Sequence, residues 1–288
     1  MTAYFRRHPQ AVAYLLLLPG LLYLAVFYVI PAAQMFLVSL ETGNVGTGYH
    51  LTFNWGVYAD AFNKYSDQII RSLFYGLLAT LLTFVLGFPL AYFIAFRGGR
   101  YKNLLLFLVV APFFTSFLLR TLSWRIIFAD DGLVLGPLKG IGILPDDFRL
   151  LATPIAVIAG ITYNFLPFMT LPLYVALEKI PVSVLEAAQD LYAARWQRLR
   201  RVTIPMALPG IVAGSLLTFI PAVGDYINAE LLGNPQSQMI GNVIQSRFLR
   251  VGDYPTGSAL SFILMAAILI AVFIYARFVG TEQLTGGG

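Results

Sequence analysis

Long uncharged stretches dominate the chain and predict its architecture. Six of them are apolar and reach about 20 residues, the helical length that crosses the ~30 Å hydrocarbon core of a bilayer. They are too long and too apolar for buried helices of a soluble protein. The pattern predicts an all-α, polytopic membrane protein with one transmembrane domain over residues 1–288. We place the spans at about 11–40, 72–96, 103–128, 152–177, 206–229 and 256–277.

The first span resembles a secretory signal peptide in one respect. It follows Arg6 and Arg7 and contains Pro31-Ala32-Ala33, a stretch typical of a cleavage site. Its apolar part is much longer than the core of a signal peptide, which has about 7–15 residues. We therefore expect an uncleaved transmembrane helix.

Composition supports the membrane assignment and excludes several kinds of site. Hydrophobic residues make up 58% of the chain and charged residues 11%, against about 25% charged in a soluble domain. There is no cysteine, which excludes disulfides, thiol nucleophiles and thiolate metal sites. The two histidines, His8 and His50, are too few for a histidine metal cluster without carboxylates. We expect no metal and no cofactor bound by this chain.

The net charge of +5 is distributed unevenly over the loops. With the N-terminus inside, eleven Lys and Arg residues lie in inner segments and five in outer loops. The inner ones are Arg6, Arg7, Arg97, Arg100, Lys102, Lys179, Arg195, Arg198, Arg200, Arg201 and Arg277. This bias predicts that both termini are cytoplasmic. The excess of basic residues is thus explained by the orientation of the chain in membrane lipid, and we expect no nucleic-acid partner.

One long cytoplasmic loop, residues 178–205, separates the fourth and fifth spans. Ser183 and Glu186 form an S-x-x-E pattern, which predicts a capping box at the start of a helix. A second, basic helical stretch follows and ends before Pro205. The first helix is short and amphipathic and has few positive charges. We therefore expect it to dock into another protein.

The loop resembles the EAA loop of bacterial ABC importer permeases. The family pattern is E-A-A, three residues, G, nine residues and I-x-L-P. Glu186, Ala187, Ala188 and Pro205 match this pattern, Val202 and Ile204 are apolar replacements at the right spacing, and Tyr192 stands at the usual glycine. Glycine would permit a positive φ and a sharp break, so with Tyr192 we expect a softer one. The resemblance implies that these residues form the coupling helix that sits in a cleft of an ATP-hydrolysing subunit.

Four other regions resemble the polyamine-type (spermidine/putrescine) permeases of the same family. They are Pro112–Arg125, Tyr163–Tyr174, Ile220–Tyr226 and Met239–Asn242. The resemblance implies a type I ABC importer permease in the bacterial inner membrane. It implies as partners a second homologous permease subunit, two ATP-binding subunits that hold ATP and Mg, and an extracytoplasmic substrate-binding protein. Sugar, phosphonate and ferric-ion permeases share parts of these regions, so the solute stays open.

Motifs for ATP binding and for hydrolysis are missing from the sequence. It has no G-x-x-x-x-G-K-[ST], no G-x-S-x-G and no H-E-x-x-H pattern. We therefore expect a transport subunit and not an enzyme, with ATP hydrolysis supplied in trans. A stand-alone secondary transporter would favour internal repeats and buried charges, and we find no convincing repeat. A membrane-embedded enzyme would need a cluster of His, Asp or Glu, which the inner loops lack.

Carboxylates follow the fifth span and are candidates for the substrate path. Asp225 ends this span, Tyr226 is adjacent and Glu230 follows. Carboxylates beside an aromatic face suit an organic ammonium through ion pairing and cation–π contact. The alternative is that they pair with Arg120, with Arg125 or with an arginine of a partner subunit.

The third and fourth spans hold further polar and aromatic candidates. Tyr163, Asn164 and Phe165 lie mid-span, where two prolines loosen backbone hydrogen bonding, and we expect them to line the path. Arg120 lies 17 residues into the third span, about 26 Å along a straight helix at ~1.5 Å per residue. We expect Arg120 to snorkel to the outer interface and Arg125 to lie further out, both as anchors.

The topology can be tested by cysteine labelling, because the native chain has no cysteine. A membrane-impermeant thiol reagent should label Thr52→Cys in intact cells. It should label Gln197→Cys only after the membrane is opened. The reverse result, or equal labelling of both, would contradict cytoplasmic termini.

Overall fold

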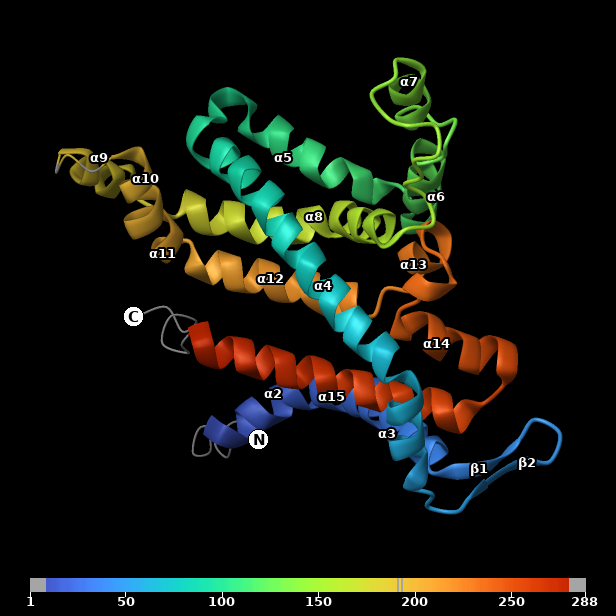
Figure 1. Ribbon diagram of the computed structural model, residues 1–288. Coiled ribbons are helices and arrows are strands. Elements are labelled where there is room, and N and C mark those ends of the chain that lie inside the picture. The colour runs from blue at the N-terminus through green and yellow to red at the C-terminus, as the bar shows by residue number, and fades with distance from the viewer. Residues whose placement is uncertain (1–8, 191, 193, 280–288) are drawn as a thin grey trace. The chain divides into compact units, whose positions relative to one another are not determined.

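The computed structural model describes residues 9–190, 192 and 194–279 (Figure 1). Its chain divides into two compact units. One contains the described residues up to Lys64 together with Ser246–Ile263, and the other contains Tyr65–Gln245 and the described residues from Leu264 onward. Arg6, Arg7 and both ends of the chain, which the topology prediction uses, lie outside the described residues.

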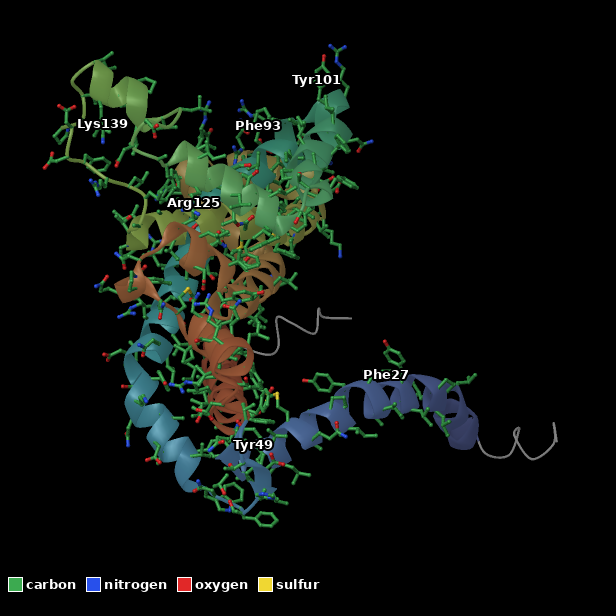
Figure 2. The ribbon with its side chains drawn as sticks, turned by 90° about the vertical axis from the view of Figure 1, so that its right-hand side faces the viewer. Phe27, Tyr49, Phe93, Tyr101, Arg125 and Lys139 are labelled. Atoms are coloured by element: carbon green, nitrogen blue, oxygen red, sulfur yellow. The ribbon has the colours of Figure 1, made fainter. Side chains whose placement is uncertain are left out.

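The first unit begins with a long continuous helix over the predicted first span. A π-helical turn, Ala25–Val29, joins α2 to α3, and side chains such as Phe27 project from it (Figure 2). The unit's elements are α2 (Pro9–Leu24), α3 (Ile30–Ser39), β1 (Glu41–Asn44), β2 (Gly48–Leu51), the start of α4 (Gly56–Arg97), a π-helical turn (Arg247–Val251) and the start of α15 (Tyr254–Val279). The two strands are an addition to the all-α prediction.

An antiparallel hairpin of β1 and β2 follows the first span, with Glu41 opposite Leu51. Its turn is stabilised by the Asn44 side chain, which accepts from the backbone N–H groups of Gly46 and Thr47. The Tyr49 hydroxyl donates to the carbonyl of Gly252, and the Tyr49 ring lies 5.4 Å from that of Tyr254. The hairpin is therefore held within its own unit by contacts to the start of α15.

The second unit contains the other predicted spans. Its elements are the rest of α4, α5 (Lys102–Val110), α6 (Phe117–Ile127), α7 (Leu135–Gly140), α8 (Pro154–Glu178), α9 (Val182–Asp190), α10 (Arg195–Arg198), α11 (Ile204–Met206), α12 (Leu208–Val223), α13 (Ile227–Leu232), α14 (Ile240–Ser246) and the rest of α15. Short 3₁₀ turns occur at Gly99–Tyr101, Ala111–Phe114 and Pro235–Ser237, and a π-helical turn at Leu199–Thr203. α4 kinks at Tyr65, where φ is −119°.

Helix α8 packs along α12, and α5 also contacts α8 (Figure 1). Small residues permit the close approach of α8 and α12. A Cβ atom on Gly210 would lie 2.6 Å from the carbonyl oxygen of Pro172, and one on Gly214 would lie 3.0 Å from that of Met169. Two glycines four residues apart on one helix face are typical of tight helix pairs in membranes.

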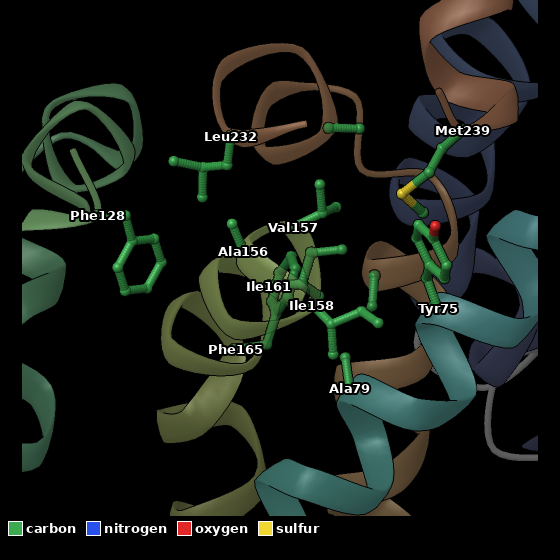
Figure 3. Close-up of a cluster of buried hydrophobic side chains, with 12 residues drawn as sticks. Tyr75, Ala79, Phe128, Ala156, Val157, Ile158, Ile161, Phe165, Leu232 and Met239 are labelled. Atoms are coloured by element: carbon green, nitrogen blue, oxygen red, sulfur yellow. The ribbon is translucent and has the colours of Figure 1, made fainter. Parts of the chain in front are cut away.

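Two clusters of buried side chains form the core of this unit. The Ile161 cluster joins α4, α8, α12 and α13 (Figure 3). It contains Tyr75, Ala79, Phe128, Ala156, Val157, Ile158, Ile161, Phe165, Ala222, Ala229, Leu232 and Met239. The Leu173 cluster lies toward the other end of α8 and contains Phe88, Ala91, Ile94, Met169, Leu173, Tyr174, Leu177, Ile180 and Ala207. α8 contributes to both clusters and is the central helix of the unit.

Within the described residues, four helices are long and apolar enough to cross a membrane, and six spans result if each of two bent pairs is one span. The third predicted span bends by 93° between Phe114 and Phe117, and the fifth is preceded by a bend of 67° before Leu208. The prediction of a straight third span is therefore wrong, and with it the depth of Arg120 along that helix. The fifth span also ends earlier than predicted, at Val223.

Candidate functional site

The predicted docking loop forms two short helices, α9 and α10, as expected. Helix α9 begins at Val182, so Ser183 lies inside its first turn. Among the described residues, the side chains of Ser183 and Glu186 make no capping hydrogen bond, and the N–H of Val184 instead donates to the carbonyl of Pro181 at 3.1 Å. The predicted capping box is therefore wrong, because the helix starts two residues too early for Ser183 to cap it.

Helix α9 is largely exposed and packs against the bundle through Leu185. Glu186 and Ala187 are exposed, whereas Leu185 and Ala188 are half-buried. Leu185 packs against the Leu173 cluster. Gln189 Oε1 accepts from Arg198 Nη1 at 3.1 Å, which ties α9 to α10. The exposed Glu186 and Ala187 thus lie on a helix that is anchored from behind.

Tyr192 adopts a left-handed backbone conformation, which glycine adopts at the least cost. Its φ is +57°, in the left-handed region that residues with a Cβ adopt only at an energetic cost. Its N–H donates to the carbonyl of Gln189 at 2.9 Å, and its side chain is 97% exposed. The expectation of a softer break is therefore wrong: the turn after α9 is as sharp as glycine would make it, with the ring in the open.

The second half of the loop returns the chain to the bundle. Val202 and Ile204 are half-buried, Ile204 packs against the Leu173 cluster, and Pro205 is exposed. Beside it, Lys102 Nζ lies 2.6 Å from Glu178 Oε1, so an ion pair joins the start of α5 to the end of α8. The loop thus begins and ends on fixed parts of the helix bundle.

A chain of buried polar side chains links α6, α8 and α13. Asn164 Nδ2 donates to Thr121 Oγ1 and to Asn228 Oδ1, both at 3.1 Å. The Asn228 N–H donates to Asp225 Oδ1 at 2.8 Å, and its Nδ2 donates to Asp225 Oδ2 at 2.6 Å. All four side chains are buried. The structure therefore brings two predicted path residues, Asn164 and Asp225, into one network through Asn228.

Asp225 is a buried carboxyl group with no cationic neighbour among the described residues. It has no ion pair with Arg120, Arg125 or any other basic residue that the structure describes. Both of its oxygens instead accept from Asn228. Neutral hydrogen-bond donors offset only part of the free energy needed to bury a charged carboxylate. The loss of its hydration costs on the order of several kcal/mol. A nearby cation would therefore stabilise the ionised form of Asp225 further.

Tyr226 and Glu230, the other candidates on this segment, are exposed. Asn242 holds both: its Nδ2 donates to the carbonyl of Tyr226 at 2.9 Å and to Glu230 Oε2 at 3.3 Å. Asp225 and Glu230 therefore lie on the same short segment but in different surroundings, one buried and one open.

Tyr163 and Phe165 lie in an aromatic cluster between α6 and α8. The Tyr163 ring packs edge-on against Trp124 at 5.1 Å, and the Phe165 ring lies 6.1 Å from that of Phe117. Tyr163 is half-buried and Phe165 is buried. Tyr163, Asn164 and Phe165 thus all contact α6 or its side chains, and only Tyr163 is partly open.

Arg120 and Arg125 differ in exposure although they share α6. Arg125 is exposed, as an anchor would be (Figure 2). Arg120 is 9% exposed, and its guanidinium lies 4.8 Å from the centre of the Phe113 ring. The expectation that Arg120 snorkels to an interface is wrong, because the 93° bend turns its part of the span toward α8.

The family model for the "binding-protein-dependent transport system inner membrane component" matches residues 55–280. The chain belongs to this family. It is 39% identical over 256 residues to the spermidine/putrescine transport system permease protein PotB of Haemophilus influenzae, a match that covers 88% of this chain and 90% of the relative. The protein is thus a permease subunit, a multi-pass component of the bacterial inner membrane.

Solved structures show the same fold. A chain of a bacterial ABC transporter involved in alginate import superposes with a TM-score of 0.76 at 19% identity, covering 96% of the permease and 97% of that chain. A second, from a bacterial alginate ABC transporter in complex with a pentasaccharide-bound periplasmic protein, superposes with a TM-score of 0.68 at 21% identity, covering 100% and 99%. The permease has the type I ABC importer fold that the sequence predicts.

Sequence reasoning missed Thr121 and Asn228, although both belong to the buried network of the permease. One local signal was present. Asp225 stands three residues before Asn228 at the start of α13, the spacing of a helix-capping acidic residue and the N–H that it accepts from. Thr121 gave no such signal, because its partner Asn164 is 43 residues away.

The network predicts a graded loss of stability. Asn228→Leu keeps most of the side-chain volume but removes the Nδ2 donor to Asp225 and the Oδ1 acceptor of Asn164, and it should cost about 1–3 kcal/mol. Thr121→Val removes one hydroxyl and leaves Asn164 bound to Asn228, so it should cost about 0.5–1.5 kcal/mol. Thermal unfolding of the purified permease checks the order. Equal losses for the two variants would contradict the central place of Asn228.

Proposed function

We propose that the permease is the transmembrane subunit of an ATP-driven importer for polyamines such as spermidine and putrescine, or a similar small organic cation. The 39% identity to the spermidine/putrescine permease of Haemophilus influenzae, over nearly the whole of both chains, supports this substrate class. The two alginate transporter structures are below 25% identity and carry no argument about the substrate.

The charge of the site supports a cationic substrate. Asp225 is a buried carboxylate without an ion pair in the described part of the chain, and Tyr226 and Glu230 stand next to it in sequence. An ammonium group would pair with the carboxylates and stack on aromatic rings. Asp225 is the single observation that carries this assignment, because a phosphonate or another anion would be repelled from it.

The working unit contains further subunits. It includes a second homologous permease, two ATP-binding subunits and an extracytoplasmic substrate-binding protein, and ATP and Mg are held by the ATP-binding subunits. The family name and the periplasmic protein in the second alginate complex support these partners. The loop from Glu178 to Pro205 is the coupling element. Glu186 and Ala187 form its exposed docking face, and Tyr192 ends the docking helix.

The docking face can be tested by a charge reversal. Glu186 is exposed and stands in the fifth position of α9, so Glu186→Lys should change the stability of the fold by less than about 0.5 kcal/mol. ATP-driven uptake and co-purification with the ATP-binding subunit should fall at least about tenfold, equivalent to about 1.4 kcal/mol of binding. Docking of the substrate-binding protein at the other face should stay normal.

Asp131→Lys is the matched control, since Asp131 is an exposed acidic residue outside the loop. It should leave uptake and assembly unchanged. Normal uptake and normal assembly in Glu186→Lys would overturn the coupling role of the docking face.

The substrate assignment predicts the opposite pattern for the carboxylates. Asp225→Asn combined with Glu230→Gln should reduce uptake of radiolabelled spermidine by reconstituted transporter about tenfold or more, because each change removes a negative charge from the path. Assembly with the ATP-binding subunit should be intact. Asp147→Asn, at an exposed carboxylate on another loop, is the control. Unchanged uptake in the double variant would refute the role of both carboxylates.

A further inference from the structure

Arg120 lies on aromatic rings instead of on a carboxylate. Its guanidinium carbon is 4.8 Å from the ring centre of Phe113 and 5.7 Å from that of Phe117. Both distances are within the ~6 Å range of cation–π attraction. A charge that is nine-tenths buried is therefore held mainly by the faces of two phenylalanines.

These rings belong to a connected aromatic group, which we call the aromatic box: Phe113, Phe117, Phe165 and Phe168. Phe113 packs edge-on against Phe168 at 5.2 Å, and Phe165 lies 6.0 Å from Phe168. Phe117 and Phe165 close the other side at 6.1 Å. The box is built from both arms of the bent third span and from α8, and it opens on the side of Phe113 and Phe168, each 37% exposed.

The structure shows no hydrogen bond or ion pair to a described residue that holds the Arg120 guanidinium in the box. Arg120 Nε and Nη1 are buried without a hydrogen-bond partner in the described part of the chain. No carboxylate of the described residues lies within ion-pair distance of the side chain. Withdrawal of the guanidinium from the rings therefore breaks no ion pair and no side-chain hydrogen bond that the structure shows.

An apolar groove reaches the open side of the box. It has a volume of about 640 Å³, lies between α8 and α12, and includes Phe168 in its wall. Its lining extends from Pro167 to Lys179 on α8, twelve positions or about 18 Å of helix at ~1.5 Å per residue. Phe168 thus belongs both to the box and to a groove that runs to the end of α8 where the coupling loop begins.

We propose that the aromatic box is a binding site for an ammonium group of the transported cation, and that Arg120 fills it as a tethered substitute when no substrate is present. The proposal rests on the proposed function for its substrate class. One cation occupies the box in both states, the Arg120 guanidinium before substrate binds and the substrate ammonium afterwards. The box is therefore neither left empty nor occupied by two positive charges. Arg120 thereby closes the site until an organic cation displaces its guanidinium.

Direct binding to the assembled transporter tests the exchange. Radiolabelled spermidine is titrated onto the purified complex without ATP and without the substrate-binding protein. Arg120→Gln removes the competing cation and should bind spermidine about tenfold more tightly than the unaltered complex. Arg120→Lys keeps a cation and should stay near the unaltered complex. Arg125→Gln, at an exposed arginine of the same helix, is the matched control and should change nothing.

Substitution of one ring distinguishes binding in the aromatic box from a general electrostatic effect of removing the Arg120 charge. Phe117→Leu keeps an apolar side chain but removes one aromatic face from whichever cation occupies the box, so alone it should change spermidine binding little. Combined with Arg120→Gln, it should cancel most of the gain. The proposal is overturned if Arg120→Gln binds no more tightly than the unaltered complex, or if its gain survives Phe117→Leu. If Arg120→Gln does not assemble, Arg120→Met, which also removes the cation and keeps a long side chain, takes its place with the same expected results.

A second probe distinguishes failure of the box from failure of the substrate assignment. Tetraethylammonium carries a cation without a polyamine chain, and Arg120→Gln should raise its binding as well. Absence of spermidine uptake by the unaltered transporter, together with tighter tetraethylammonium binding in Arg120→Gln, would reject polyamines and keep the box. Normal spermidine uptake with no change in the binding of either probe would reject the box alone.

Discussion

The structure depends on one constraint: a polar group removed from water must find its partner inside the protein. Helices satisfy the backbone, but polar side chains in apolar spans need partners from other helices. Asn164 on α8 finds them in Thr121 on α6 and Asn228 on α13. Asn228 in turn provides both donors to Asp225. The bent arm of the third span is therefore held against α8 by hydrogen bonds as well as by packing.

Helix α8 connects the two parts of the site. The network with Asp225 lies at the Ile161 cluster, whereas the coupling loop is packed through Leu185 and Ile204 against the Leu173 cluster. Both clusters include side chains of α8, and α12 is pressed closely against it at Gly210 and Gly214. Contacts are thus continuous from the exposed face of Glu186 to the network around Asp225. The proposed docking face and the proposed substrate carboxylate are thus connected through the packing of one helix.

Three exceptions to ordinary structure lie at regions proposed to function. Tyr192 holds a positive φ at the end of the docking helix, where local strain fixes a sharp turn. Arg120 keeps a buried charge on aromatic rings, and Asn164 keeps one buried oxygen without a partner in the described part of the chain. Strain and unsatisfied polarity persist only where the surrounding packing holds them, and here they lie in the coupling loop and beside the substrate candidates.

The sequence by itself determined the membrane class, the positions of the apolar helices and the docking loop, because these follow from uninterrupted hydrophobic runs and from local spacing. It indicated a polar role for Asn164 and Asp225, since such residues are costly inside an apolar span. Only the tertiary structure decided the 93° bend after Phe114, the burial of Arg120 and the partners of Asp225. Thr121 and Asn228 form a hydrogen bond although they are 107 residues apart in the sequence. Hydropathy along the chain indicates which segments are helices, but it does not indicate where a helix bends or which other helix it packs against.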